Sequence, residues 1–310
     1  MSVAMREAFG RHLAEMGKTH PELVVLDADV SSSTKNALFK KEFPNRFYNV
    51  GVQEGNLAGM AAGLASCGYH PVINAFAIFL ALKSSDQIRN DICYNNLPVI
   101  IAGAYGGLSD SFDGASHQAI EDIAYFRALP NMELIIPSDA RQSELALEYA
   151  LTRNNPVYIR LNRNAMPDIE TDRDEFFKAK AVKMLSGKDV TIAANGITAS
   201  AALEAAALLK KEGIEAEVFS VPFVKPLDST SIFESAEKTG CLVTVEEHLL
   251  SGGFYSALAE EGFKSGLKAK VSPIAINDKF GETGPYLDLL AKYGLDAKSI
   301  CENVKKLLSK

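Results

Sequence analysis

The stretch RFYNVGVQEGNLAGMAAGLASCGYHPVINAF, residues 46–76, places a long segment rich in alanine and glycine between two short strand-like segments. The flanking segments, 46–52 and 70–76, have the length and composition of buried strands. The segment between them has the length of a helix, which Gly68 is placed to end. A strand, a helix and a second strand in this order form the repeating unit of a parallel sheet.

The same alternation continues through the rest of the chain, interrupted once by a polar stretch. We therefore predict an α/β protein with two domains, each a mainly parallel sheet with helices on both faces. The first domain is expected at residues 1–168, a linker at 169–184 and the second domain at 185–310. The expected strands lie in segments 22–30, 46–52, 70–76, 97–107, 132–139, 156–163, 189–196, 216–222, 241–248 and 270–277.

Charge and cysteine content narrow the class of protein. The net charge of −7 gives no basic surface for nucleic acid or an anionic membrane. The apolar runs are too short to span a bilayer, and the first residues carry charges throughout, unlike a signal peptide. The four cysteines, at 67, 93, 241 and 301, form no paired motif and are expected to be reduced thiols. We expect a cytoplasmic protein.

Ligands of parallel sheets bind beyond the carboxyl ends of the strands, and unusual polar residues of the first domain follow its strands. Asp27 and Asp29 precede three serines in DADVSSST, where they can cap a helix or, with Ser33, contact a ligand. Arg160 and Arg163 in YIRLNRNAMP suit a phosphate or a surface ion pair.

Three further candidates have an ordinary and a functional interpretation. Glu54 can stabilise the first turn of its helix, or it can be a functional carboxylate in a segment otherwise suited to burial. Phe76 and Phe79 can pack in the core or form a shelf for a flat heterocycle. Asp113 and His117, in GLSDSFDGASHQ, can belong to a solvated loop capped by Ser116 or line a site that exchanges protons.

Taken together, VGVQEG, NAFAIF and DGASHQ resemble the transketolase family of thiamine diphosphate enzymes. The resemblance covers nearly the whole chain, with a pyrimidine-binding domain followed by the C-terminal domain. FVKPLD and EEHLLSGG in the second half resemble the related deoxyxylulose-phosphate synthases. The resemblance implies transfer of a two-carbon ketol unit from a ketose phosphate to an aldose phosphate.

The resemblance also implies how the cofactor is held. Glu54 would hydrogen-bond N1′ of the pyrimidine and so promote loss of the proton from the thiazolium carbon, a reaction that belongs to the cofactor. Phe76 would stack on the pyrimidine with Phe79 packed beside it, while Leu82 stands where the family has a further aromatic. Asp29 and Val30 match the family's cofactor-contacting pair.

For the substrate, the resemblance implies that Asp113 reads a hydroxyl and that His117 assists proton transfer at the carbonyl. Ser33 and Arg163 match the family's phosphate ligands. Tyr105 stands where transketolases have a histidine that binds the C1 hydroxyl and the phosphate end. This departure predicts a non-standard ketose phosphate, for example a branched one.

The chain contains no GDG sequence, with which the family anchors Mg²⁺ and the diphosphate on a separate domain. We therefore expect a partner subunit that carries the diphosphate-binding domain and the Mg²⁺ ligands. The cofactor would lie between the two chains, and two copies of each chain would form an α₂β₂ heterotetramer.

Two other functions remain open from the sequence. The β subunit of a 2-oxoacid dehydrogenase E1 has the same two-domain plan, although DGASHQ and Arg163 favour a sugar phosphate. A non-catalytic subunit that keeps the fold is the other, although Glu54, Asp113 and His117 argue against it. In the second domain, the sequence pattern of Glu246, Glu247 and His248 indicates a turn with solvated acids or, as a second choice, a dimer contact.

Overall fold

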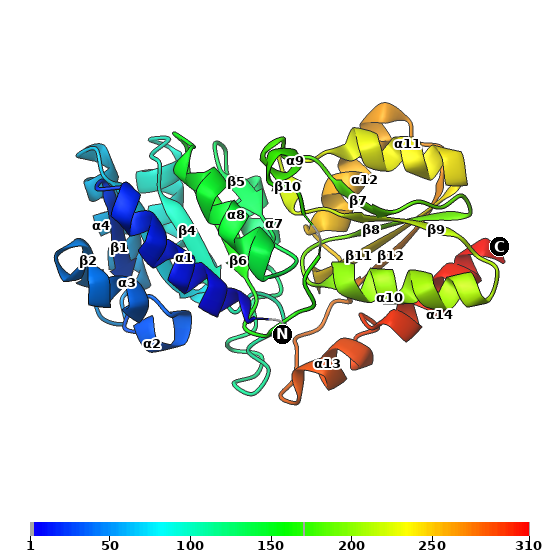
Figure 1. Cartoon of the computed structure of the whole chain (residues 1–310), viewed down its shortest axis with the longest axis horizontal. Coiled ribbons are helices and arrows are strands. Elements are labelled where there is room, and N and C mark those ends of the chain that lie inside the picture. The colour runs from blue at the N-terminus through cyan, green and yellow to red at the C-terminus, as the bar shows by residue number, and fades with distance from the viewer. Residues whose placement is uncertain (1–2, 170, 310) are drawn as a thin grey trace.

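The computed structural model describes residues 3–169 and 171–309 and contains two sheets, each flanked by helices (Figure 1). The first sheet has the order β10-β5-β6-β4-β3-β1-β2, and the second has the order β12-β11-β8-β9-β7. All pairings are parallel except β10 with β5 and β7 with β9. The predicted fold class is confirmed.

The strands of the first sheet come almost entirely from the first half of the chain. The strands β1, β4 and β6 are buried along their full length, as expected for a sheet covered on both faces. The bounds are β1 (Leu23–Asp27), β2 (Phe47–Asn49), β3 (His70–Phe76), β4 (Ile100–Ala104), β5 (Glu133–Ile135), β6 (Val157–Leu161) and β10 (Phe223–Lys225).

The helices of the first half pack on both faces of this sheet. The helix α4 packs against β3, and its residues Leu57, Ala58 and Ala61 are fully buried. The bounds are α1 (Met5–Thr19), α2 (Ser31–Thr34), α3 (Ala37–Glu42), η1 (Pro44–Arg46), α4 (Glu54–Ser66), α5 (Ala77–Leu82), α6 (Ser85–Gln87), the π-helix η2 (Ile88–Cys93), α7 (Asp122–Ala128) and α8 (Ala140–Leu151).

The second sheet forms the other half of the molecule. Its strands are β7 (Val182–Leu185), β8 (Val190–Ala194), β9 (Ala216–Ser220), β11 (Cys241–Leu249) and β12 (Lys270–Ile276). Its helices are α10 (Thr198–Lys211), α11 (Ser229–Thr239), α12 (Phe254–Ser265), α13 (Tyr286–Lys292) and α14 (Ala297–Leu308). The short helix α9 (Arg173–Phe177) packs instead on the first half, where Phe176 is buried against Phe223 of β10. Within the residues that the structure describes, no helix is long and apolar enough to cross a membrane.

The two halves are connected more closely than a simple linker would allow. The segment 169–184, expected to be the linker, contains α9 and the first residues of β7. The three-residue strand β10 comes from the second half, yet it pairs antiparallel with β5 at the edge of the first sheet. Such a short strand gives no periodic signal in the sequence.

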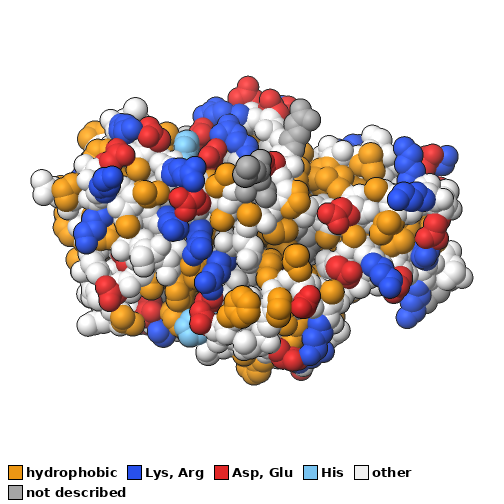
Figure 2. All heavy atoms as spheres, turned by 60° about the horizontal axis from the view of Figure 1, so that its bottom comes forward, with side chains coloured by type: hydrophobic (Ala, Val, Ile, Leu, Met, Phe, Trp, Pro, Cys, Tyr) orange, Lys and Arg blue, Asp and Glu red, His pale blue; other side chains and the backbone are white. Residues whose placement is uncertain are grey.

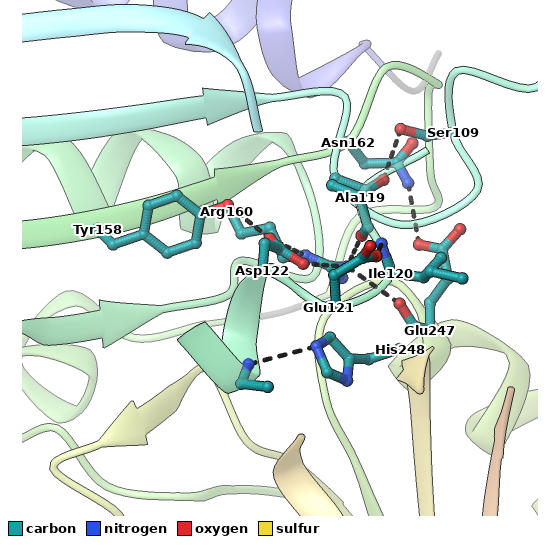
Figure 3. A network of polar contacts seen from close by, with 12 residues as sticks. Ser109, Ala119, Ile120, Glu121, Asp122, Tyr158, Arg160, Asn162, Glu247 and His248 are labelled. Carbon is teal, nitrogen blue, oxygen red and sulfur yellow. Dashed lines mark hydrogen bonds and ion pairs between the residues drawn. The ribbon is translucent and has the colours of Figure 1, made fainter. Parts of the chain in front are cut away.

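A buried ion pair lies where the halves meet (Figure 3). Arg160, at the end of β6, donates to both carboxylate oxygens of Asp122 at distances of 2.8 and 3.0 Å. Its guanidinium also donates to the backbone oxygens of Ala119 (2.7 Å) and Glu247 (3.1 Å). Neither charged side chain is more than 5% exposed, so each depends on the other for its charge to be compensated.

The interpretation of Glu246, Glu247 and His248 as a solvated turn was wrong. These residues continue β11, and all three are buried. The acids are satisfied by backbone groups: Glu246 accepts from the amides of Phe254 and Tyr255 at the start of α12. Glu247 faces the first half. The sequence shows only two adjacent acids, which by composition indicate a surface.

Glu246 makes stability depend on pH in an unusual direction. Burial raises the pKa of this carboxyl group to about 7, above its value in an unfolded chain. The stabilisation by this side chain is therefore complete only below pH 4.5, declines above that pH and is lost as the pH rises through 7. Glutamine does not titrate, so Glu246→Gln does not undergo this loss. As the pH rises from 5 to 8, the unfolding free energy of the variant relative to wild type should therefore increase by up to about 3 kcal/mol. Urea unfolding across this range measures the difference, and a pH-independent difference would contradict it.

Candidate active site

The candidate residues of the first domain gather at one edge of its sheet. The strands β6, β4, β3 and β1 are neighbours and parallel, so the segments that follow them meet at their shared carboxyl edge. Figure 2 brings this edge forward and shows Lys and Arg side chains across the left-hand half of the face, with acids among them. Hydrophobic side chains gather where the two halves meet (Figure 2).

An aromatic cluster occupies the middle of the edge. The rings of Phe76 and Tyr105 are stacked, with centroids 4.8 Å apart. Phe79 lies 5.7 Å from Phe76, and His117 lies edge-on to Phe79 at 5.1 Å and to Phe76 at 5.9 Å. The fold therefore brings His117 from the long loop to both predicted aromatics, which neither the core interpretation nor spacing alone predicts.

Glu54 begins α4 and is only 5% exposed. Its Oε1 accepts from Lys83 Nζ at 3.2 Å, and the same ammonium lies 3.7 Å from the centre of the Phe79 ring. One cation therefore contacts both the carboxylate and the aromatic face. A protonated aminopyrimidine offers the same two features, a cationic N–H and a flat ring, so these residues fit the pyrimidine of thiamine diphosphate.

Two carboxylates lie at the end of β1 and just after it: Asp27 has a structural role, whereas Asp29 is accessible to a ligand. Asp27 is buried and accepts from the Val30 amide (2.7 Å) and the Asn36 side chain (3.1 Å), so it stabilises the turn before α2. It is not the N-cap of that helix, which is Val30. Asp29 is exposed in a left-handed backbone conformation (φ 66°) and accepts only from Asn49 among the described residues. Asp29 and Val30 thus stand at the edge where a ligand can reach them.

A cluster of cationic side chains surrounds Tyr105. Its hydroxyl donates to the Ser33 backbone oxygen at 3.1 Å and also pairs with Arg6, which itself donates to Ser33 O. The Arg163 guanidinium lies 4.9 Å from the centre of the same ring. Arg6 was not predicted from the sequence. The sequence shows Arg6 only as a cation in the first turn of a helix, next to the apolar residues Met5 and Phe9, which does not single it out as a site residue.

The long loop between β4 and α7, residues 105–121, contributes the acids. Arg163 Nη1 lies 2.5 Å from Asp110 Oδ1 and 3.9 Å from Asp113 Oδ2. Asp113 is exposed, whereas Asp110, which was not predicted, is fully buried. Burial, followed by the hydrogen bond and charge of Asp113, raises the pKa of Asp110 to about 6 against the effect of Arg163.

Two other predicted positions lie differently. Leu82 is 55% exposed and leaves the place of the family's further aromatic open. Arg160 is buried at the domain boundary in its ion pair with Asp122, so it is not free to bind a phosphate. No group of three or more His, Cys, Asp or Glu residues suited to a metal ion occurs within residues 3–169 and 171–309.

Comparisons with known proteins identify the family of the chain. Residues 1–168 match the family described as "Transketolase, pyrimidine binding domain" and residues 179–300 match "Transketolase, C-terminal domain". The chain is 40% identical over 308 residues to a "Putative transketolase C-terminal section" of Methanocaldococcus jannaschii, with 99% of this chain and 96% of the relative covered. It is 33% identical to one subunit of an apulose-4-phosphate transketolase of Phocaeicola vulgatus, with 99% of this chain and 98% of that subunit covered.

A solved structure, "Split gene transketolase, inactive beta4 tetramer", is 45% identical with a TM-score of 0.91, and 99% of both chains is covered. The chain also spans about half the length of curated 1-deoxy-D-xylulose-5-phosphate synthases, such as the Geobacter sulfurreducens enzyme, of which it covers 47% at 38% identity. The two-domain fold is that of a transketolase C-terminal section. This chain belongs to the transketolase family, whose members are transferases.

Proposed function

We propose that this chain provides the pyrimidine end of a thiamine diphosphate site for transfer of a two-carbon ketol unit from a ketose phosphate to an aldose phosphate. The observation that supports this most directly is the buried Glu54 carboxylate, which shares one cation with the Phe79 ring. A carboxylate held out of water beside an aromatic face suits a heterocycle that must gain and lose a proton. When bound, the cofactor supplies the carbon nucleophile.

Each side chain of the site then has a role. Glu54 holds a proton at the pyrimidine, and Phe76 and Phe79 orient its ring, with Asp29 and Val30 beside it. Asp113 accepts a hydrogen bond from a substrate hydroxyl, and His117 moves a proton at the carbonyl. Ser33 and Arg163, together with Arg6, bind the anionic end of the substrate, because guanidinium groups pair with phosphate bidentately.

The donor sugar is expected to be non-standard. The Tyr105 ring stacks on Phe76, and its hydroxyl is already paired with Arg6 and Ser33 O. An imidazole at this position would present a ring nitrogen to the substrate, whereas the stacked phenol fills that space with carbon. We propose a ketose phosphate whose shape differs from that of the usual pentose phosphates, such as a branched one.

A second subunit completes the enzyme in this proposal. The chain has no GDG sequence, and two of its relatives are named as a section or a subunit of a transketolase. We propose that a cytoplasmic α₂β₂ heterotetramer forms, in which two copies of this chain associate and the partner binds Mg²⁺ and the diphosphate. The solved relative is described as an inactive beta4 tetramer, which fits an enzyme that needs a second kind of chain.

Activity and tight cofactor binding should therefore depend on a partner. Alone, the chain should bind thiamine diphosphate at least about 100-fold more weakly than the reconstituted complex. It lacks the partner's contacts with the diphosphate, each of which is a charge-assisted hydrogen bond that contributes about 1.5–3 kcal/mol. Calorimetry with Mg²⁺ present compares the two, using as partner the GDG-carrying chain of a split-gene transketolase.

The same preparations separate the possible reactions. We expect ketol transfer from ketose phosphates only in the mixture, with no oxidation of pyruvate by an artificial electron acceptor. Tight cofactor binding by the chain alone would contradict the shared site. Pyruvate oxidation without ketol transfer would favour a 2-oxoacid dehydrogenase instead.

A further inference from the structure

Glu247, in the second half of the chain, contacts the loop that carries Asp113 and His117. Glu247 Oε1 accepts from the backbone amide of Leu108 at 2.9 Å and from the Tyr286 hydroxyl at 2.9 Å. The carboxylate also lies so close to Gly107 that a Cβ added there would collide with it, and Gly107 has a φ of 65° that favours glycine. The start of the loop is therefore shaped around this side chain.

The carboxyl end of β11, which carries Glu247, also contacts the end of the loop. The Leu249 amide donates to Ile120 O at 2.8 Å, and the Ala124 amide lies 3.4 Å from His248 Nε2. Arg160 joins the two halves further, since its Nη2 donates both to Ala119 O and to Glu247 O. Figure 3 shows Glu247 and His248 at the end of β11, facing the segments that contain Ser109 and Ala119 to Asp122.

Within the loop, the two ends are also tied to each other. The Gly107 amide donates to Ala119 O at 2.8 Å, which closes residues 107–119 into a compact loop. Asp110, Asp113 and His117 all lie inside this closed segment. Movement of Leu108 or Ala119 would consequently shift Asp110, Asp113 and His117.

We propose that Glu247 is a positioning residue, through which the C-terminal domain fixes the β4–α7 loop and with it Asp113 and His117. Leu108 is fully buried, and its amide finds its acceptor in the Glu247 carboxylate instead of in a backbone oxygen. Without Glu247 this buried amide would have no acceptor among the described residues. Tyr286 and Asn162 orient the carboxylate in turn, since Asn162 donates to Tyr286 Oη at 2.7 Å. Burial raises the pKa of Glu247 to about 7, which fits a side chain enclosed by the protein.

Glu246 offers a matched control on the same strand. It is equally buried, and its pKa is also raised to about 7 by burial, yet its carboxylate accepts from Phe254 and Tyr255 at the start of α12 instead of from the loop. Loss of either acid removes a buried acceptor from backbone amides. Only loss of Glu247 should affect the loop.

Amide hydrogen exchange of the full chain, without cofactor or partner, tests the positioning role directly. In Glu247→Ala, peptides covering residues 106–120 should exchange at least about tenfold faster, while those at the start of α12 are unchanged. Glu246→Ala should give the reverse pattern. Glu247→Gln keeps one acceptor oxygen and should restore most of the protection, and Tyr286→Phe tests the same contact if Glu247→Ala does not fold. Equal loop exchange in Glu247→Ala and Glu246→Ala would overturn the proposal. Where Glu247→Ala is unfolded, unchanged loop exchange in Tyr286→Phe would overturn it.

A second readout connects the loop to catalysis and rests on the proposed function. In the reconstituted complex, Glu247→Ala should lower kcat/KM for the ketose phosphate about 10- to 100-fold while leaving the Kd for thiamine diphosphate unchanged. Glu247→Gln should recover most of it, and Glu246→Ala should match wild type. An active wild type with an unaffected Glu247→Ala overturns the positioning role. An inactive wild type whose loop still loosens in Glu247→Ala refutes the proposed reaction and leaves the structural role intact.

Discussion

Glu54→Gln should reduce kcat of the reconstituted enzyme about 10³-fold, with little change in KM for the ketose phosphate. A positioned acid or base contributes roughly 10²- to 10⁴-fold, and the amide of glutamine cannot hold the proton that the Glu54 carboxylate exchanges. Because Glu54 lies at the start of α4 and not beside the Arg163 cluster, substrate binding should be preserved. Steady-state kinetics at saturating thiamine diphosphate measures both parameters.

Glu133→Gln is the control for this variant. Glu133 is also a buried glutamate with a cationic partner, Arg153, but it stands at the amino end of β5, away from the candidate site. Its replacement should leave kcat within about twofold, because its hydrogen bonds to described side chains go to Tyr149, Arg153 and Asn155. A Glu54→Gln enzyme with wild-type kcat would refute the role of this carboxylate and restore the interpretation of a helix-stabilising acid.

Arg160→Met should destabilise the chain by about 3–5 kcal/mol, whereas Arg163→Met, three residues away, should cost no more than about 1–2 kcal/mol. Removing Arg160 leaves the fully buried Asp122 without a counter-charge and takes one donor away from the backbone oxygens of Ala119 and Glu247. Arg163 is one-third exposed, and its partner Asp110 already has a raised pKa, so it can take up a proton when Arg163 is absent. Urea unfolding at neutral pH gives both values.

In substrate binding the order should be reversed: Arg163→Met should have the larger effect and Arg160→Met the smaller. Arg163→Met should raise KM for a phosphorylated ketose about 10- to 100-fold, since a charge-assisted hydrogen bond is worth about 1.5–3 kcal/mol. The same sugar without its phosphate should show little change, which separates lost anion binding from general damage. Arg160→Met, assayed where it is folded, should keep the wild-type preference for the phosphate. A fully stable Arg160→Met, or an Arg163→Met with unchanged KM, would contradict the assignment of these roles.

Much of the first sheet was predictable because its strands are continuous apolar runs between helices, and parallel pairing fixes which ends meet. Phe76, Phe79, Asp113 and His117 could be expected at one edge for this reason. The contacts between them could not, since the stacking of Tyr105 on Phe76 and the approach of His117 depend on the path of the long loop. Whether these residues perform the roles that the family resemblance implies stays a prediction.

The failures have a common physical cause. Arg160, Glu246 and Glu247 have charged side chains, and charge is a reliable sign of exposure only when no partner is available within the fold. Their partners, such as Asp122, Leu108 and Phe254, lie far away in the sequence or are backbone groups that no side-chain pattern reveals. Arg6 and Asp110 were missed for the same reason: each acquires its significance from Tyr105 or Arg163, which only the folded chain brings near.

The strand β10 has a consequence for how the molecule is made. During translation, β5 is synthesised well before residues 223–225, so its outer edge emerges from the ribosome with unpaired amides and carbonyls. The first sheet can close that edge only after the chain has continued into its other half. The first half therefore cannot finish folding as an independent unit while the ribosome is still adding the residues that complete its sheet.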